Sequence, residues 1–199
     1  MAALRKIIWG FIVIFAGFSG WFAYELYTSD IGMTEKPYGV AFELTDMNGA
    51  PITEAAFRGQ PTALFFGFTH CPEVCPTTLY ELDGWLRKAD PEGNRINAYF
   101  ITVDPERDPP EIMNNYVSAV SDRIVGISGD PRKVAAVIKG FHIYAKKVAI
   151  DGSAIEDDYT MDHTASVFLL DADGRFKSTI AWGENPENAV KKLENLLKG

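Results

Sequence analysis

Residues 61–76 read PTALFFGFTHCPEVCP, and this stretch indicates the architecture of the chain. Its first eight residues form a largely apolar run that is followed by a cysteine motif. Such a run is typical of a short strand that is buried on both faces, as in the sheets of α/β proteins. Pro76 then precedes leucines at positions 79, 82 and 86, a stripe that predicts a helix with proline in its first turn. The stretch therefore predicts a strand, a loop with both cysteines, and a helix.

The rest of the chain continues this alternation of strand and helix patterns. The order predicts a layered α/β domain whose sheet carries helices on both faces. The expected strands or hairpins are residues 39–60, 61–68, 96–104, 123–129 and two strands within 165–182, and the expected helices are 76–90, 111–120, 131–145 and 186–197.

The composition is that of one ordinary globular domain with a short appendage. Of the 199 residues, 47% are hydrophobic and 23% are charged, values that fit a folded domain of common size. The formal net charge is −8, whereas proteins that bind a phosphate backbone present basic surfaces. We therefore expect no nucleic-acid partner.

The appendage is an apolar segment near the start of the chain. Residues 7–24 contain no charged side chain, and as a helix they would span roughly 27 Å, close to the thickness of a bilayer core. Arg5 and Lys6 precede the segment, whereas Glu25 and Asp30 follow it. This asymmetry predicts a single-pass anchor with a cytoplasmic N-terminus. A cleaved signal peptide is the alternative reading of such a segment.

These observations predict three parts of the chain. Residues 1–28 form a cytoplasmic tip and transmembrane anchor, residues 29–37 a linker, and residues 38–199 the folded domain. Because so few residues precede the apolar segment, we expect a bacterial inner membrane, with the domain in the periplasm.

Cys71 and Cys75, the two cysteines of the chain, lie between the predicted strand and the predicted helix. The carboxyl ends of strands in such sheets commonly bind ligands, and a helix N-terminus lowers the pKa of a nearby thiol. A spacing of four residues allows both thiols to share one face, and it also permits a disulfide. From spacing alone, a metal site and a disulfide remain open.

The histidines favour a metal. Of the three in the chain, His70 adjoins a cysteine but is expected to point elsewhere, and His142 fits an ordinary partly buried helix position. His163 precedes the strand expected beside residues 61–68, so it can reach the cysteines. Two thiolates and one imidazole suit Cu(I), whereas structural zinc normally takes four protein ligands. An inert stapled loop is the third reading.

Three segments together resemble the Sco (SenC) family of membrane-anchored copper chaperones for cytochrome c oxidase. They are GFTHCPEVCPTTL at 67–79, ITVDPERD at 101–108 and YTMDHT at 159–164. The resemblance implies a thioredoxin-like fold with Cys71, Cys75 and His163 as the copper ligands. It implies one copper per chain, bound as Cu(I), with a Cu(II) form left open.

The resemblance also implies a function and its partners. The chain would deliver copper to the binuclear copper site of cytochrome c oxidase subunit II, or prepare that site, and other periplasmic copper proteins could act as donors. Asp162, beside the histidine, is a candidate to orient its ring through a hydrogen bond. Neither Asp162 nor Asp104 is expected to be a ligand.

A membrane-anchored thiol–disulfide oxidoreductase is the alternative function. Such enzymes usually carry two residues between their cysteines, whereas this chain has three, and they tend to have a proline before the strand that faces the thiols. Here that position reads DHTAS, with His163 and no proline. Both differences favour a metal, but a reversible Cys71–Cys75 disulfide is retained as a second function.

Overall fold

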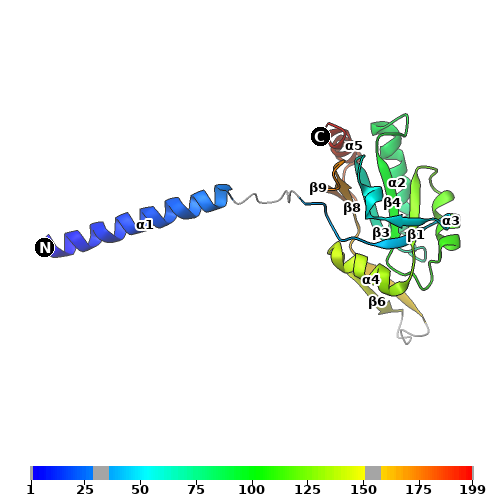
Figure 1. Cartoon of the computed structure of the whole chain (residues 1–199), viewed down its shortest axis with the longest axis horizontal. Coiled ribbons are helices and arrows are strands. Elements are labelled where there is room, and N and C mark those ends of the chain that lie inside the picture. The colour runs from blue at the N-terminus through cyan, green and yellow to red at the C-terminus, as the bar shows by residue number, and fades with distance from the viewer. Residues whose placement is uncertain (1, 29–35, 151–157, 199) are drawn as a thin grey trace. The chain divides into compact units, whose positions relative to one another are not determined.

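The computed structural model describes residues 2–28, 36–150 and 158–198 (Figure 1). The chain divides into two compact units, Met1–Thr34 and Glu35–Gly199. The first contains helix α1, Ala2–Thr28. Among the described residues, the second contains the strands and the remaining helices.

Along α1, the side chains from residue 8 to residue 22 are exposed. Across the described residues, the structure has no helix that combines the length and the apolar character that crossing a membrane requires. The anchor predicted over residues 7–24 stays a prediction.

The second unit is built on a mixed seven-stranded sheet. Its three central strands run parallel to one another, the next strand on each side pairs with them antiparallel, and each edge strand pairs antiparallel with its neighbour. Across the sheet the strands are β2 (Pro51–Thr53), β1 (Glu43–Asp46), β5 (Ile124–Ser128), β4 (Asn97–Thr102), β3 (Thr62–Gly67), β8 (Ser166–Leu170) and β9 (Phe176–Ala181). All six residues of β3 are buried, as the apolar run in the sequence predicts.

In the described residues, four helices and one short 3-10 helix accompany this sheet. They are η1 (Glu54–Phe57), α2 (Val74–Ala89), α3 (Pro110–Ser118), α4 (Pro131–Gly140) and α5 (Pro186–Leu196). Prolines open α3, α4 and α5, where the missing N–H costs no hydrogen bond. The side chains of Asp130 and Asn185 accept backbone N–H bonds in the first turns of α4 and α5, so ordinary capping fixes these starts.

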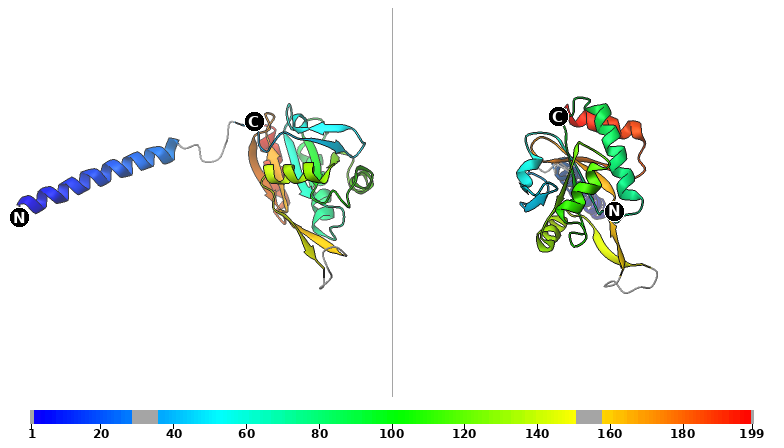
Figure 2. Two further views of the ribbon diagram at one scale, coloured as in Figure 1. Left: turned by 60° about the horizontal axis from the view of Figure 1, so that its bottom comes forward. Right: turned by 90° about the vertical axis from the view of Figure 1, so that its right-hand side faces the viewer.

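The helices cover both faces of the sheet, as predicted. Phe65 of β3 and Phe100 of β4 are register partners and stack on each other, and Phe100 also stacks on Tyr116 of α3. Phe66 points to the opposite face and contacts Phe141, directly after α4. These aromatic rings therefore pack against β3 on both faces of the sheet and form part of the core. Helices α2 and α5 pack against each other (Figure 2).

The helix predicted over residues 131–145 is too long. Helix α4 ends at Gly140, where a side chain would overlap Val40. His142 follows in a left-handed conformation with φ 55°, and it is exposed rather than partly buried in a helix. The chain then enters strand β6, Ala145–Ala149.

Strand β6 belongs to a hairpin that the sequence patterns did not predict. It pairs antiparallel with β7, Tyr159–His163, and Ala145 is the register partner of His163. This β6–β7 arm extends away from the main sheet (Figures 1 and 2). The sequences of its two short strands mix charged and apolar residues, a pattern that fits a surface helix as well as a strand.

Gly67, the last residue of β3, offers a test of this packing. A Cβ there would lie 2.8 Å from Cys75 Sγ and 2.8 Å from the ring of Phe100. We expect Gly67→Ala to lower the free energy of unfolding by about 1–3 kcal/mol through overpacking. The measurement is chemical denaturation followed by circular dichroism.

Gly84→Ala is the matched control, because a Cβ at this position of α2 meets no atom within 4 Å. That change should stabilise the protein by about 0.5–1 kcal/mol through helix propensity. Equal destabilisation by both substitutions would contradict the close contact between β3 and the Cys75 thiol.

Candidate metal centre

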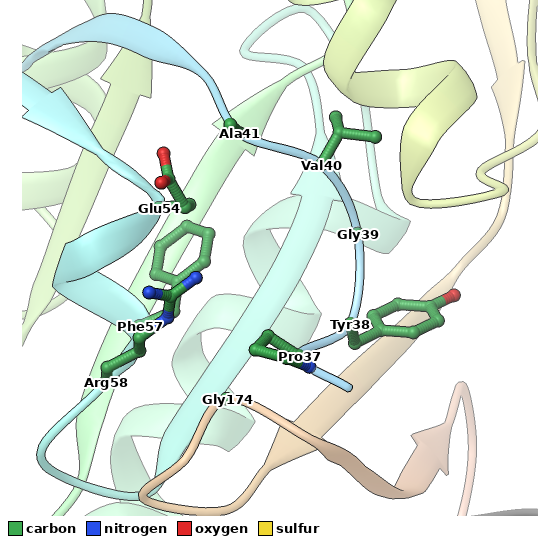
Figure 3. A pocket seen from close by; sticks show the side chains of 9 residues that line it. All are labelled: Pro37, Tyr38, Gly39, Val40, Ala41, Glu54, Phe57, Arg58 and Gly174. Atoms are coloured by element: carbon green, nitrogen blue, oxygen red, sulfur yellow. The ribbon is translucent and has the colours of Figure 1, made fainter. Parts of the chain in front are cut away.

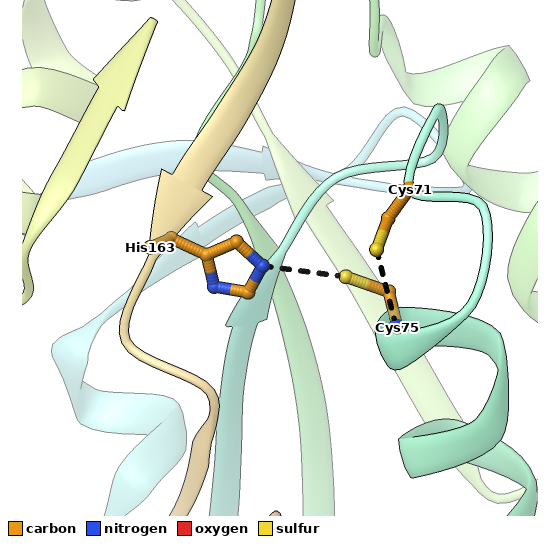
Figure 4. A group of neighbouring side chains, drawn as sticks. All are labelled: Cys71, Cys75 and His163. Carbon is orange, nitrogen blue, oxygen red and sulfur yellow. Dashed lines mark hydrogen bonds between the residues drawn. The ribbon is translucent and has the colours of Figure 1, made fainter. Parts of the chain in front are cut away.

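The structure brings together the three residues that the sequence singles out. Cys71 lies in the loop after β3, Cys75 lies in the first turn of α2, and His163 ends β7. Their ligand atoms all lie within 4.8 Å of one another (Figure 4). Among the histidine, cysteine, aspartate and glutamate side chains that the structure describes, these three form the group that could hold a metal ion.

The start of α2 sets the geometry of the two thiols. The helix begins at Val74, two residues before the predicted start, so Cys75 falls within the first turn. Its backbone N–H, unpaired within the helix, donates to Cys71 Sγ at 3.3 Å (Figure 4). Cys75 is fully buried and Cys71 is half-buried, so the pair is open to solvent on the Cys71 side.

The two thiols differ in acidity. A hydrogen bond from the Cys75 side chain is the largest influence that lowers the pKa of Cys71, to about 4, and His163 and the Cys75 N–H assist it against burial. The pKa of Cys75 is raised, first because it donates this bond and then because it is buried. The metal-free pair therefore holds one thiolate and one thiol at neutral pH.

His163 presents a nitrogen to the thiols. Its Nε2 lies 3.5 Å from Cys75 Sγ, and its Nδ1 lies 3.1 Å from the carbonyl oxygen of Thr164. Because a carbonyl can only accept, this contact places a proton on Nδ1, and Nε2 is the ring nitrogen that faces the thiols. The rings of Phe65 and Phe68 pack edge-to-face with the imidazole ring.

The prediction that Asp162 orients His163 is wrong. Neighbouring residues of a strand point to opposite faces, and Asp162 is exposed opposite Lys146. The backbone carbonyl of Thr164 takes the role instead. His70 points away from the metal group, as expected: its side chain is half-exposed and its Nδ1 lies 3.1 Å from Thr69 Oγ1.

Asp108, which the sequence patterns did not single out, fixes the loop that leads to Cys71. Its buried carboxyl group accepts bonds from the N–H of Thr69 at 3.0 Å and the hydroxyl of Thr69 at 2.6 Å. The hydroxyl of Thr102, at the end of β4, adds a third bond at 2.7 Å. Asp108 thus supports the cysteine loop without entering the metal group. Its position at the end of the ITVDPERD segment was the available signal.

Asp104, at the other end of the same segment, is almost fully buried. Its carboxyl oxygens accept bonds from Tyr159 and Arg107. As expected, it is not part of the metal group.

A separate cavity of about 190 Å³ lies between η1 and the segment before β1 (Figure 3). Glu54 and Arg58 supply its charged groups, and its wall has neither thiol nor imidazole. Its lining residues are Pro37, Tyr38, Gly39, Val40, Ala41, Glu54, Phe57, Arg58 and Gly174. This cavity does not contribute to the metal centre.

The fold and the site together define a class of protein. A soft donor set of two sulfur atoms and one imidazole nitrogen lies at the carboxyl end of a central strand, and it is half open to solvent. Such a set suits a thiophilic metal of low coordination number, Cu(I) above all. The class is a metal-binding α/β domain with paired redox-capable thiols.

The chain belongs to the SCO1/SenC family, whose profile matches residues 32–198. Mitochondrial SCO2 of Saccharomyces cerevisiae is 31% identical over 161 residues, which cover 80% of this chain and 53% of the relative. The chain thus spans about half the length of the curated relatives it matches.

Solved structures agree with this assignment. Bradyrhizobium japonicum ScoI with copper bound is 46% identical, with a TM-score of 0.72 over 80% of this chain and 99% of that one. BsSco, a member of the Sco family of cytochrome c oxidase assembly proteins with an identified disulfide switch, is 18% identical over 82% of this chain and 95% of that one. Its TM-score of 0.61 shows likeness of fold. The predicted thioredoxin-like α/β fold is confirmed.

The acidity of Cys71 can be tested by alkylation. Because its pKa is lowered to about 4, we expect the reduced protein to react with iodoacetamide at Cys71 with little change in rate from pH 6 to pH 8. Replacing Cys75 by alanine removes the main stabilising bond, so the Cys71 pKa should rise and the reaction at pH 6 should slow. Mass spectrometry of the labelled cysteine over a pH series provides the measurement. A wild-type rate that rises tenfold per pH unit up to about pH 8, like an ordinary thiol, would refute the lowered pKa.

Proposed function

We propose that this protein is a copper chaperone that binds one Cu(I) through Cys71, Cys75 and His163. The observation that carries the proposal is the convergence of their three ligand atoms within 4.8 Å. The hydrogen bond of His163 Nδ1 to a carbonyl leaves Nε2 free to bind the metal. Two thiolates and a neutral imidazole give the Cu(I) site a net charge of −1.

The copper seen in Bradyrhizobium ScoI supports the choice of metal. Membership of the SCO1/SenC family, together with the description of BsSco as a member of a cytochrome c oxidase assembly family, supports a role in oxidase assembly. We propose that the acceptor is the binuclear copper site of cytochrome c oxidase subunit II, and that periplasmic copper proteins are the donors.

Partial exposure of the site suits transfer between proteins. Cys71 and His163 are half-buried, whereas Cys75 is buried. A three-coordinate Cu(I) can accept a further ligand from a partner before one of its own ligands leaves. We propose that a partner approaches from the Cys71 side and that Cys75 is the last ligand to release copper.

Thiol–disulfide exchange is the second candidate function. The observation in its favour is the contact of Cys71 Sγ with the Cys75 backbone, together with the lowered pKa of Cys71. A Cys71 thiolate could attack a partner disulfide, and Cys75 could then displace the partner thiolate, leaving a Cys71–Cys75 disulfide. His163 forms and breaks no bond in this reaction, so the reaction can be separated from copper binding.

We also propose that residues 7–24 anchor the domain in a bacterial inner membrane. The lack of charge in this segment and the basic residues before it support the proposal. A reporter enzyme active only in the periplasm, fused after residue 199, should be active. A cytoplasmic signal from that fusion would contradict the proposed orientation.

The copper site is tested by titrating the reduced full chain with Cu(I) without oxygen, in competition with a chromogenic chelator. We expect one copper per chain. Replacing His163 by alanine removes one of three ligands, so the affinity should fall by more than about tenfold. His142→Ala is the matched control, since His142 is exposed and outside the metal group, and it should bind like wild type.

Reduction of a disulfide-bonded partner peptide by the same three proteins separates the two functions. Equal copper affinity in wild type and His163→Ala, with rapid disulfide reduction by both, would replace the chaperone by the oxidoreductase.

A further inference from the structure

The β6–β7 arm carries His163, but among the described strands the arm is tied to the main sheet only where β7 leads into β8. Among the described strands, β6 and β7 pair with each other and with no strand of the seven-stranded sheet. After His163 the chain passes through two residues into β8, which pairs with β3. Without another contact, the arm could pivot about this connection and carry the imidazole away from the thiols.

The guanidinium group of Arg107 supplies such a contact at the start of β7. Its Nη1 donates to the backbone carbonyl of Tyr159 at 2.9 Å, and its Cζ lies 3.7 Å from the centre of the Tyr159 ring. Its Nε donates to Asp104 at 2.5 Å, and the Tyr159 hydroxyl donates to the same carboxyl group at 2.9 Å. We call Asp104, Arg107 and Tyr159 the arm clamp.

Burial distinguishes this clamp from a surface ion pair. The side chains of Asp104 and Arg107 are 1% and 23% exposed, so solvent screens their attraction less than it would at the surface. The planar guanidinium group also bonds and stacks in fixed directions, which a lysine cannot reproduce. Lys147 of β6 lies over the same ring at 4.4 Å and pairs with Glu106, so both strands of the arm contact the segment 104–107.

The clamp and the metal ligand lie on one face of one strand. Tyr159, Met161 and His163 alternate along β7 and therefore point to the same side. Met161 packs against the core, and His163 lies about 13 Å from Tyr159 along the strand, at about 3.3 Å per residue. The position of Tyr159 is therefore transmitted to His163 along the five paired residues of β7.

We propose that Arg107 is a positioning residue that keeps His163 within reach of Cys71 and Cys75 by clamping Tyr159. Arg107 acts through the histidine and does not touch the metal. The inference rests on the proposed copper site for its effect on affinity, but the position of the ring can be measured without copper.

The first test uses the metal-free protein. In the reduced full chain, nuclear Overhauser effects should connect the rings of His163 and Phe68, whose centres are 5.7 Å apart. We expect Arg107→Met to weaken or abolish these effects. Arg87→Met is the matched control, because Arg87 also pairs with two carboxyl groups but lies on α2, and it should leave them intact. Unchanged effects in Arg107→Met would overturn the inference, whatever the protein binds.

The second test is a double-mutant cycle on Cu(I) affinity with wild type, Arg107→Met, His163→Ala and the double variant. Arg107→Met should weaken binding about tenfold but cause no further loss once His163 is absent. An equal further loss in the His163→Ala background would show an effect that bypasses the histidine and would overturn the inference.

Arg107→Lys is measured in parallel, because it keeps the charge if Arg107→Met fails to fold. It should lose less affinity than Arg107→Met but more than Arg87→Met, and wild-type ring contacts and affinity in Arg107→Lys would overturn the role of the planar guanidinium. If wild type binds no Cu(I), the proposed function fails, while the ring contacts still decide the role of Arg107.

Discussion

The arrangement of the site depends on one buried carboxyl group, that of Asp108. A carboxyl group in the interior must be hydrogen-bonded or it costs several kcal/mol. Asp108 meets this requirement with the Thr69 backbone, the Thr69 hydroxyl and the Thr102 hydroxyl. Its own backbone carbonyl accepts from Ser128, the last residue of β5. One residue thereby joins the carboxyl ends of β3, β4 and β5, the edge of the sheet where the cysteine loop begins.

The segment 104–108 therefore contacts both parts of the chain that carry the proposed ligands. At one end, Asp108 holds Thr69 and with it the loop to Cys71 and Cys75. At the other end, Asp104 bonds to Tyr159 at the start of the strand that ends at His163. The thiols and the imidazole come from parts of the sequence nearly ninety residues apart, as the separation of 88 between Cys75 and His163 shows. The short polar segment 104–108 is thus hydrogen-bonded both to the cysteine loop and to the strand that ends at His163.

Much of this arrangement follows from local patterns in the sequence. The apolar run of β3, the proline-led helices and the closing hairpin are strong periodic signals, and all are present. The β6–β7 arm was missed because residues 145–149 mix charged and apolar side chains as the preceding helix does. The helix ends at Gly140, where a side chain would overlap Val40, and a sequence does not show that contact. The role of Asp108 was missed for a different reason. Its partner Thr69 is 39 residues away, so the bond itself could not be inferred from local patterns, and the available signal was the position of Asp108 in the ITVDPERD segment. Similarly, the neighbouring side chain of Asp162 was the candidate for orienting His163, because the sequence gives no sign of which backbone carbonyl the ring meets.

Copper K-edge X-ray absorption of the reduced full chain, loaded with one equivalent of Cu(I), tests the central claim most directly. The claim is that Cys71, Cys75 and His163 together form the copper site. It predicts an inner shell of two sulfur atoms and one nitrogen atom, and the multiple scattering of an imidazole ring. A shell of sulfur alone, or one without two sulfur atoms, would contradict it.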